Sequence, residues 1–209
     1  MPSLSQILSD HSPLLLLDAS SEVIQAAVLT RDGEPRWASR REESGTGLFA
    51  CLDELGVEIG AMASFAFCEG PGSILGIRTS AMTVRVWNAL RPQPTFGYFS
   101  LAVLAEGAPE GTTLIADARR HLWHQFKKGG SLGRVPATDL LPPIATPEMF
   151  RHWDPLPAGV KLLPYDLAAI LRMPRAADAD LFRPRPEPEA FLHQEPDYAK
   201  WTPQIHRAP

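Results

Sequence analysis

A glycine-rich corner separates an apolar run from a long helical pattern, and it constrains the fold more than any other stretch. The corner is Gly70-Pro71-Gly72-Ser73; it follows ASFAFC and precedes ILGIRTSAMTVRVWNAL. The apolar run is typical of a buried strand, and a serine before a helical pattern is a common N-cap. The sequence therefore predicts a strand, a tight turn and a helix N-terminus, which can bind an anion or serve close packing of helix on sheet.

The segments around this corner predict a mixed sheet with flanking helices. The dipeptide Asp32-Gly33 indicates a hairpin, which joins antiparallel strands, whereas helical crossovers join parallel strands. Strand patterns fall at 14–19, 22–30, 35–41, 63–68 and 94–99, and helical patterns at 44–56, 73–90 and 100–106. A second series, with strands expected at 112–117 and 120–127, repeats the opening order of strand, aspartate, turn and strand only coarsely.

The proline content of the chain rises sharply in its C-terminal part. Fourteen of the 21 prolines lie after residue 130, and proline breaks helices and removes a backbone donor. One helix is expected there, at 165–173, stopped by Pro174. We expect a loose arm at 1–13, a first lobe at 14–108, a smaller proline-rich lobe at 109–190 and a disordered tail at 191–209.

Composition and spacing exclude several functional classes. A net charge of −4 argues against unaided binding to duplex nucleic acid, and the longest apolar run is too short to span a membrane. Cys51 and Cys68 lie in apolar surroundings, which indicates buried thiols in a reducing compartment and predicts a cytoplasmic protein. The six histidines have no spacing typical of zinc enzymes, and no serine occupies a nucleophile elbow.

Two short polar clusters follow predicted strands and have two possible roles. Asp18 and Ser20 lie where actin-like and sugar-kinase-like ATPases hold phosphate and metal, but those proteins carry glycine after the carboxylate and this chain does not. Asp117, Arg119 and Arg120 form the second cluster. Each cluster can contribute to a nucleotide site or can stabilise a turn through side-chain hydrogen bonds and ion pairs.

Three stretches together resemble the TsaB family of bacterial tRNA threonylcarbamoyladenosine biosynthesis proteins, also called glycoprotease-like or peptidase M22-like. LLLLDASSEVIQAAVL is similar to the family's opening strand pair, and LIADARRHLWHQFK is similar to its Asp-Ala-Arg-Arg strand end. FAFCEGPGSILGIRTSAMTVRVWNAL resembles its glycine-cornered helix. The matching positions in that third stretch are Gly70, Pro71, Gly72, Ser73, Gly76 and Arg78.

The resemblance implies an α/β fold of the actin-like ATPase or ribonuclease H-like type, with mixed sheets, flanking helices and two related lobes. It implies a non-catalytic subunit, without cofactor or metal, that dimerises with a metal-bearing transferase subunit (TsaD-like) in an assembly with a small ATPase (TsaE-like). That assembly forms N6-threonylcarbamoyladenosine next to the tRNA anticodon. The chain itself would contact tRNA only indirectly, through the other subunits of the assembly.

The implied partner interface lies on the first two long helices and the corner between strand and helix. An apolar centre with charged edges is typical of such surfaces. The residues expected there are Leu48, Phe49, Leu52, Gly70, Pro71, Gly72, Ser73, Arg78, Met82 and Arg85.

Two alternatives stay open at this point. The first is an ATP-binding phosphotransferase of the same fold that uses Asp18 and the corner. The second is a homodimeric scaffold that has lost the pathway.

Overall fold

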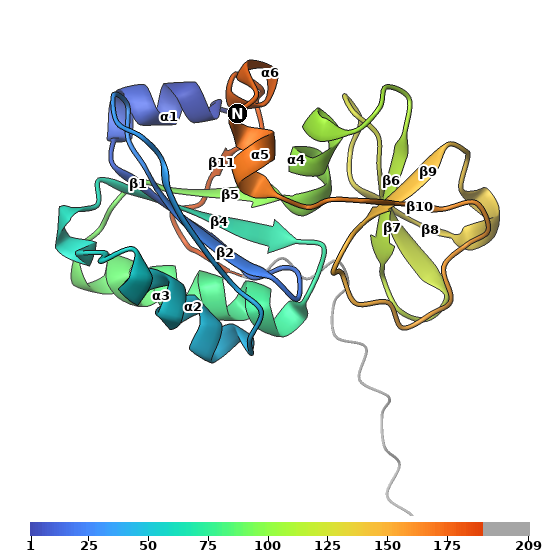
Figure 1. Ribbon diagram of the computed structural model, residues 1–209, viewed down its shortest axis with the longest axis horizontal. Coiled ribbons are helices and arrows are strands. Elements are labelled where there is room, and N and C mark those ends of the chain that lie inside the picture. Colours follow the sequence, from blue (N-terminus) through green and yellow to red (C-terminus); the bar gives the residue numbers. More distant parts are fainter. Residues whose placement is uncertain (190–209) are drawn as a thin grey trace, which may run out of the picture.

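Two mixed β-sheets form two lobes that lie side by side in the computed structural model, which describes residues 1–189 (Figure 1). The first sheet has the strand order β11-β5-β4-β1-β2-β3, and the second has the order β10-β9-β6-β7-β8. In the first sheet the strands are β1 Leu14–Asp18, β2 Ile24–Leu29, β3 Arg36–Arg40, β4 Ser64–Gly70, β5 Thr95–Phe99 and β11 Arg183–Pro184. In the second they are β6 Thr113–Asp117, β7 Leu122–Phe126, β8 Gly133–Pro136, β9 Ile144–Pro147 and β10 Lys161–Leu163.

Helices cover both faces of the first sheet, which is why its central strands read as continuous apolar runs. Along β1, Leu15 and Leu17 pack in the cluster that includes residues of α2 and α3, whereas Leu14 and Leu16 pack in the cluster with α1, α4 and α5. Figure 1 shows α2 and α3 together on one side of this sheet. The helices are α1 Leu4–His11, α2 Ser44–Glu54, α3 Ile74–Leu90, α4 Ser100–Gly107, α5 Leu167–Leu171 and α6 Pro174–Ala177.

The second sheet repeats the topology of the first. β1 pairs antiparallel with β2 and parallel with β4, and β6 pairs in the same way with β7 and β9. The next strands correspond as well, because β3 and β8 are antiparallel to β2 and β7, and β5 and β10 are parallel to β4 and β9. The sequence shows this duplication only as a coarse echo, since residues 113–163 contain no α-helix that would match α2 or α3.

The N-terminal arm expected at 1–13 is instead a helix that belongs to the first lobe. Ser3 caps α1 by accepting a hydrogen bond from the Gln6 N–H at 3.2 Å. Leu4 and Ile7 are buried in the core beside α4 and α5. The prediction missed this helix because the polar residues between these two apolar positions suggest a loop, and only the sheet behind them supplies a surface to pack on.

The C-terminal part also returns to the first lobe, whereas the sequence suggested a second lobe that extends to residue 190. β11 pairs with β5, and the Arg185 N–H donates to the Thr95 carbonyl at 2.7 Å. The helix expected at 165–173 spans only Leu167–Leu171, and Pro174 begins α6 rather than ending a helix. Proline fits the first turn of a helix, where its missing N–H costs nothing. The predicted tail at 191–209 lies outside the described residues.

No helix within residues 1–189 combines the length and the apolar character that a bilayer crossing requires.

Candidate functional site

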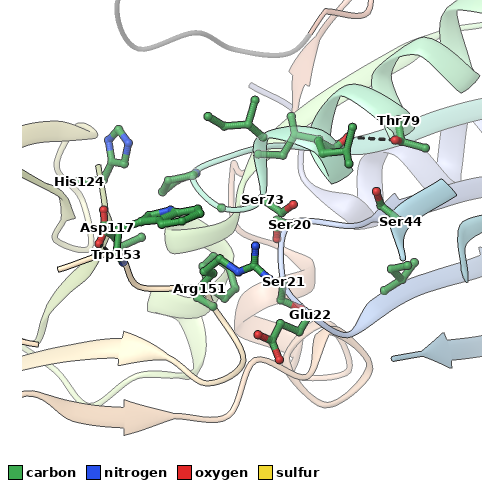
Figure 2. A pocket seen from close by; sticks show the side chains of 18 of the residues that line it. Ser20, Ser21, Glu22, Ser44, Ser73, Thr79, Asp117, His124, Arg151 and Trp153 are labelled. Carbon is green, nitrogen blue, oxygen red and sulfur yellow. Dashed lines mark hydrogen bonds between the residues drawn. The ribbon is translucent and has the colours of Figure 1, made fainter. Parts of the chain in front are cut away.

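A cleft of about 1230 Å³ lies between the two lobes. The first lobe lines it with the loop after β1, the start of α2 and the corner before α3; the second lines it with the loop after β6 and residues 150–153. Figure 2 shows Ser20, Ser21 and Ser73 on one side of it and Asp117 and Trp153 on the other. The carboxyl ends of strands β1 and β6 meet here, and such ends are the usual ligand-binding edge of α/β sheets.

Asp18 ends β1 at this edge, and its carboxylate is fully buried and fully occupied. Oδ1 accepts hydrogen bonds from the Ser20 N–H at 2.8 Å and the Ser20 hydroxyl at 2.6 Å. Oδ2 accepts from the hydroxyls of Tyr98 and Tyr165, each at 2.8 Å. These four hydrogen bonds occupy both oxygens of a carboxylate that is fully buried, so in this arrangement no oxygen is exposed to a metal ion or a phosphate.

The hydroxyls of Tyr98 and Tyr165 keep their protons well above neutral pH and so remain hydrogen-bond donors to Asp18. Burial, and then the charge of Asp18, raises the pKa of both Tyr98 and Tyr165 well above the usual value. Burial also raises the pKa of the neighbouring Cys68 thiol well above its usual value, with the charge of Asp18 adding to the effect. Tyr98 comes from β5 and Tyr165 from the chain that returns from the second lobe, so no local signal near residue 18 could have predicted them.

Asp117 ends β6, the strand that corresponds to β1, and its carboxylate is also occupied. Oδ1 accepts from the Arg119 N–H at 2.6 Å, and Oδ2 accepts from the N–H groups of Trp153 and Asp154 at 2.6 and 2.9 Å. The structure therefore supports the turn role for Asp117. Hydrogen bonds rather than ion pairs stabilise this turn, because within residues 1–189 no ion pair joins Asp117 to Arg119 or Arg120.

The glycines of the corner allow two backbones to touch. A Cβ at Gly76 would lie 1.8 Å from the carbonyl oxygen of Ala19, and one at Gly72 would lie 2.3 Å from that of Ser20. The Ser73 N–H donates to the same Ser20 carbonyl at 2.7 Å, and the Ser73 hydroxyl accepts from the Gly76 N–H as the predicted N-cap. The corner thus locks the loop after β1 onto the start of α3.

Glu69, which precedes the corner, is buried and doubly paired. Its carboxylate bonds to Arg183 at 2.6 Å and to Arg185, and the Arg183 guanidinium lies 3.9 Å from the centroid of the Phe99 ring. A buried carboxylate needs such partners to offset its lost hydration. Both arginines come from β11 and the residue after it, more than 100 positions along the chain, so sequence analysis could not assign them to Glu69.

The predicted interface residues divide into a buried and an exposed set. Leu48 and Leu52 are wrong as interface residues, because both lie in the core beneath α2. Phe49 on α2 and Met82 on α3 are about half exposed, at 51% and 52%. Arg78 and Arg85 are exposed on α3, and Arg85 pairs with Glu189 at 3.3 Å.

An apolar line runs along the outer face of α3. Its members, spaced alternately by four and three residues, share one face of the helix, and Leu75, Met82 and Val86 are 69%, 52% and 55% exposed. We call this line the α3 stripe: Leu75, Thr79, Met82, Val86 and Ala89. The Thr79 hydroxyl donates to the Leu75 carbonyl at 2.9 Å, so its polar atom is already bonded within the helix (Figure 2).

Groups of three or more histidine, cysteine, aspartate or glutamate side chains able to hold a metal ion are absent from residues 1–189.

Comparison with known proteins assigns the architecture. No family model and no curated protein sequence matches the chain. Among solved structures the chain is similar to YeaZ from Pseudomonas aeruginosa, with 24% identity over 75% of this chain and 89% of YeaZ and a TM-score of 0.56. The chain has the fold of YeaZ. A second structure, of a protein described as similar to peptidase YEAZ from Pseudomonas aeruginosa, gives 24% identity over 75% and 88% of the two chains and a TM-score of 0.54.

This likeness to YeaZ confirms the predicted α/β class: two mixed sheets with flanking helices in two related lobes, of the actin-like and ribonuclease H-like type.

The contact between corner and loop predicts unequal effects of two glycine substitutions. Gly76→Ala should lower the free energy of unfolding by at least about 2 kcal/mol, because its Cβ collides with the Ala19 carbonyl. Gly45→Ala is the control: nothing lies within 4 Å of that Cβ, and alanine favours α2 by up to about 1 kcal/mol. Urea denaturation measures both, and equal losses would contradict the close approach.

The buried tyrosines predict a loss of stability at high pH. Above about pH 10 an unfolded chain loses its tyrosine protons while Tyr98 and Tyr165 keep theirs, so the folded state binds more protons and the free energy of unfolding falls as pH rises. Cys51, whose pKa is raised to about 11 mainly by burial, acts in the same direction.

Tyr98→Phe separates the tyrosine contribution from that of the thiols. At neutral pH the substitution should lower the free energy of unfolding by about 1–3 kcal/mol, because Asp18 loses a hydrogen-bond donor. With rising pH, the free energy of unfolding of the variant should fall less steeply than that of the wild type. Chemical denaturation between neutral pH and about pH 11 measures both. Parallel pH profiles for the two proteins would contradict the assignment.

Proposed function

We propose that this chain is a TsaB-like, non-catalytic partner subunit in the formation of N6-threonylcarbamoyladenosine in tRNA. It docks through the α3 stripe onto a TsaD-like transferase subunit, and a TsaE-like ATPase joins the same assembly. The proposal is supported by the fold shared with YeaZ, which is TsaB, and by the sequence resemblance of the corner and the two strand ends.

The observation that carries the proposal is the α3 stripe itself. Apolar side chains repeated every three and four residues on an exposed helix face are the pattern by which one helix packs on another. Exposed apolar side chains gathered on one helix face are typical of interaction sites on soluble proteins. Arg78 and Arg85 lie along one edge of the stripe and provide the charged rim that such interfaces have.

The Arg85–Glu189 ion pair leaves this surface accessible to a partner. Both side chains are more than half exposed, at 51% and 67%, and pairs of this kind contribute little to stability. A partner carboxylate can therefore replace Glu189 at small cost.

The fully hydrogen-bonded carboxylate of Asp18 supports a non-catalytic role for this chain. The alternative, an ATP-dependent phosphotransferase, needs a strand-end carboxylate that faces the cleft and can take a metal ion. Here the four hydrogen bonds from Ser20, Tyr98 and Tyr165 occupy both oxygens. A phosphotransferase would have to break that network in every catalytic cycle.

The stripe also fits a second copy of this chain, since one helix face can pair with itself about a two-fold axis. This is the homodimeric scaffold alternative, and it is an outcome of the test below.

Met82→Asp places a charge at the middle of the stripe and should abolish co-purification with the TsaD-like subunit, weakening binding at least about 100-fold. Its fold should survive, because Met82 is half exposed. Leu141→Asp is the matched control: Leu141 is 63% exposed on the second lobe, and its substitution should leave binding unchanged.

Calorimetry of the two subunits measures the effect, and light scattering of the chain alone follows self-association. Binding by Met82→Asp as tight as that of the wild type, or no binding by the wild type, would contradict the proposal. Loss of self-association in Met82→Asp, without wild-type binding to the transferase, would favour the scaffold.

A further inference from the structure

The C-terminal end of the described chain leads from the first sheet to helix α3. β11 pairs with β5, the Arg185 guanidinium pairs with Glu69, and the Glu189 carboxylate meets Arg85 of α3 at 3.3 Å. Prolines occupy positions 184, 186 and 188, and a residue that precedes proline is restricted to extended conformations. Pro188, directly before Glu189, is buried. This lead is therefore stiff, and it brings the chain to one edge of the α3 stripe.

The contact of Glu189 with Arg85 lies beside the middle of the stripe. Arg85 follows Met82 by three positions and directly precedes Val86, and both of these apolar side chains are more than half exposed, at 52% and 55%. One turn of helix rises about 5.4 Å, and two residues of extended chain span at most about 7 Å. The chain therefore needs to continue only to residue 191 to reach them.

The sequence after Glu189 has a composition that complements this surface. It begins AFLHQEPDYAKW, with large apolar side chains at positions 191, 192, 198 and 201. Two acids, Glu195 and Asp197, lie between these apolar pairs, and residues 190–199 contain no lysine or arginine. On α3, Arg78 is exposed two turns before Arg85 and forms no ion pair within residues 1–189. An acidic, apolar segment thus matches an apolar stripe with a basic edge.

We propose that residues 190–201 of this chain cover the α3 stripe and compete for it with the transferase subunit. The length is sufficient, because α3 rises only about 15 Å from Leu75 to Arg85, whereas twelve extended residues span up to about 40 Å. The exposed Arg85–Glu189 pair is weak, so a partner can displace the segment. The cover depends on this chain alone, and its regulatory consequence rests on the proposed function.

The chain's own segment fits the stripe better than a second copy of the chain does. A segment tethered at the stripe acts at an effective concentration of about millimolar, which a free copy does not reach at micromolar protein. The segment also brings the two acids Glu195 and Asp197, whereas a second stripe would bring another Arg78 and Arg85 to the same surface. Covering by the segment therefore hides the apolar side chains until a partner with higher affinity replaces it.

Thiol labelling of the full-length chain measures the cover without any partner. Cys51 and Cys68 are buried, and burial raises the pKa of both thiols, so a cysteine introduced by Val86→Cys in the stripe is the one that reacts fast. Leu141→Cys is the control site, because Leu141 is 63% exposed on the second lobe and lies away from the stripe.

The test compares the labelling rate with and without the apolar pair at the start of the segment. Phe191→Ser and Leu192→Ser together should speed labelling at Val86→Cys at least about fivefold, because the open fraction of the stripe rises. Ile205→Ser is the matched control outside the proposed segment and should leave this rate unchanged. Labelling at Leu141→Cys should respond to none of these substitutions.

Calorimetry with the TsaD-like subunit tests the competition. The Phe191→Ser, Leu192→Ser chain with Val86 intact should bind more tightly than the wild type by the factor found in labelling, because apparent affinity also scales with the open fraction. Faster labelling with unchanged affinity for the transferase would overturn the competition. Faster labelling without any transferase binding by the wild type would support the cover and contradict the proposed function instead.

Two outcomes would overturn the cover itself. The first is a labelling rate at Val86→Cys that is the same with and without the serine substitutions at positions 191 and 192. The second is protection of that cysteine that ignores these substitutions and disappears when the protein is diluted, which would assign the cover to a second copy of the chain.

Discussion

The hydrogen bonds that converge on Asp18 are the interaction on which the rest of the structure depends. They tie the end of β1 to its own loop through Ser20, to β5 through Tyr98 and to the C-terminal return through Tyr165. The loop fixed in this way carries the Ala19 and Ser20 carbonyls that the corner glycines approach. The start of α3, and with it the direction of the α3 stripe, is thereby set by a buried carboxylate that in an ATPase would serve chemistry.

Local pattern was enough to predict the first lobe from β1 to α4 and the N-cap at Ser73. The strands and helices there differ in the spacing at which apolar residues repeat along the sequence. Glycine, proline and the Asp32-Gly33 dipeptide mark the turns. The sequence could not show which apolar residues of α2 and α3 face outward. Leu48 and Leu52 looked like neighbours of Phe49 on a docking surface, but only the sheet beneath α2 decides that they are core and that Phe49 is exposed.

Contacts between distant segments explain the parts that could not be predicted. Glu69 beside the corner is buried, and the arginines that pair with it, Arg183 and Arg185, lie more than 100 positions further along the chain. Trp153 carried no signal in the sequence, because its place in the cleft wall depends on the Asp117 carboxylate, which accepts the N–H groups of both Arg119 and Trp153. The predicted boundaries of the second lobe failed for the same reason, since β11 joins a sheet whose other strands all precede residue 100.

We propose that the chain acts through its α3 surface and not through its strand-end carboxylate. Mass spectrometry of tRNA nucleosides tests this most directly, in cells that lack the chain and carry wild-type, Asp18→Asn or Met82→Asp protein, each checked for a cooperative melting transition. The account predicts that N6-threonylcarbamoyladenosine disappears without the chain, returns with folded Asp18→Asn and stays absent with Met82→Asp. Restoration by Met82→Asp but not by folded Asp18→Asn would contradict it.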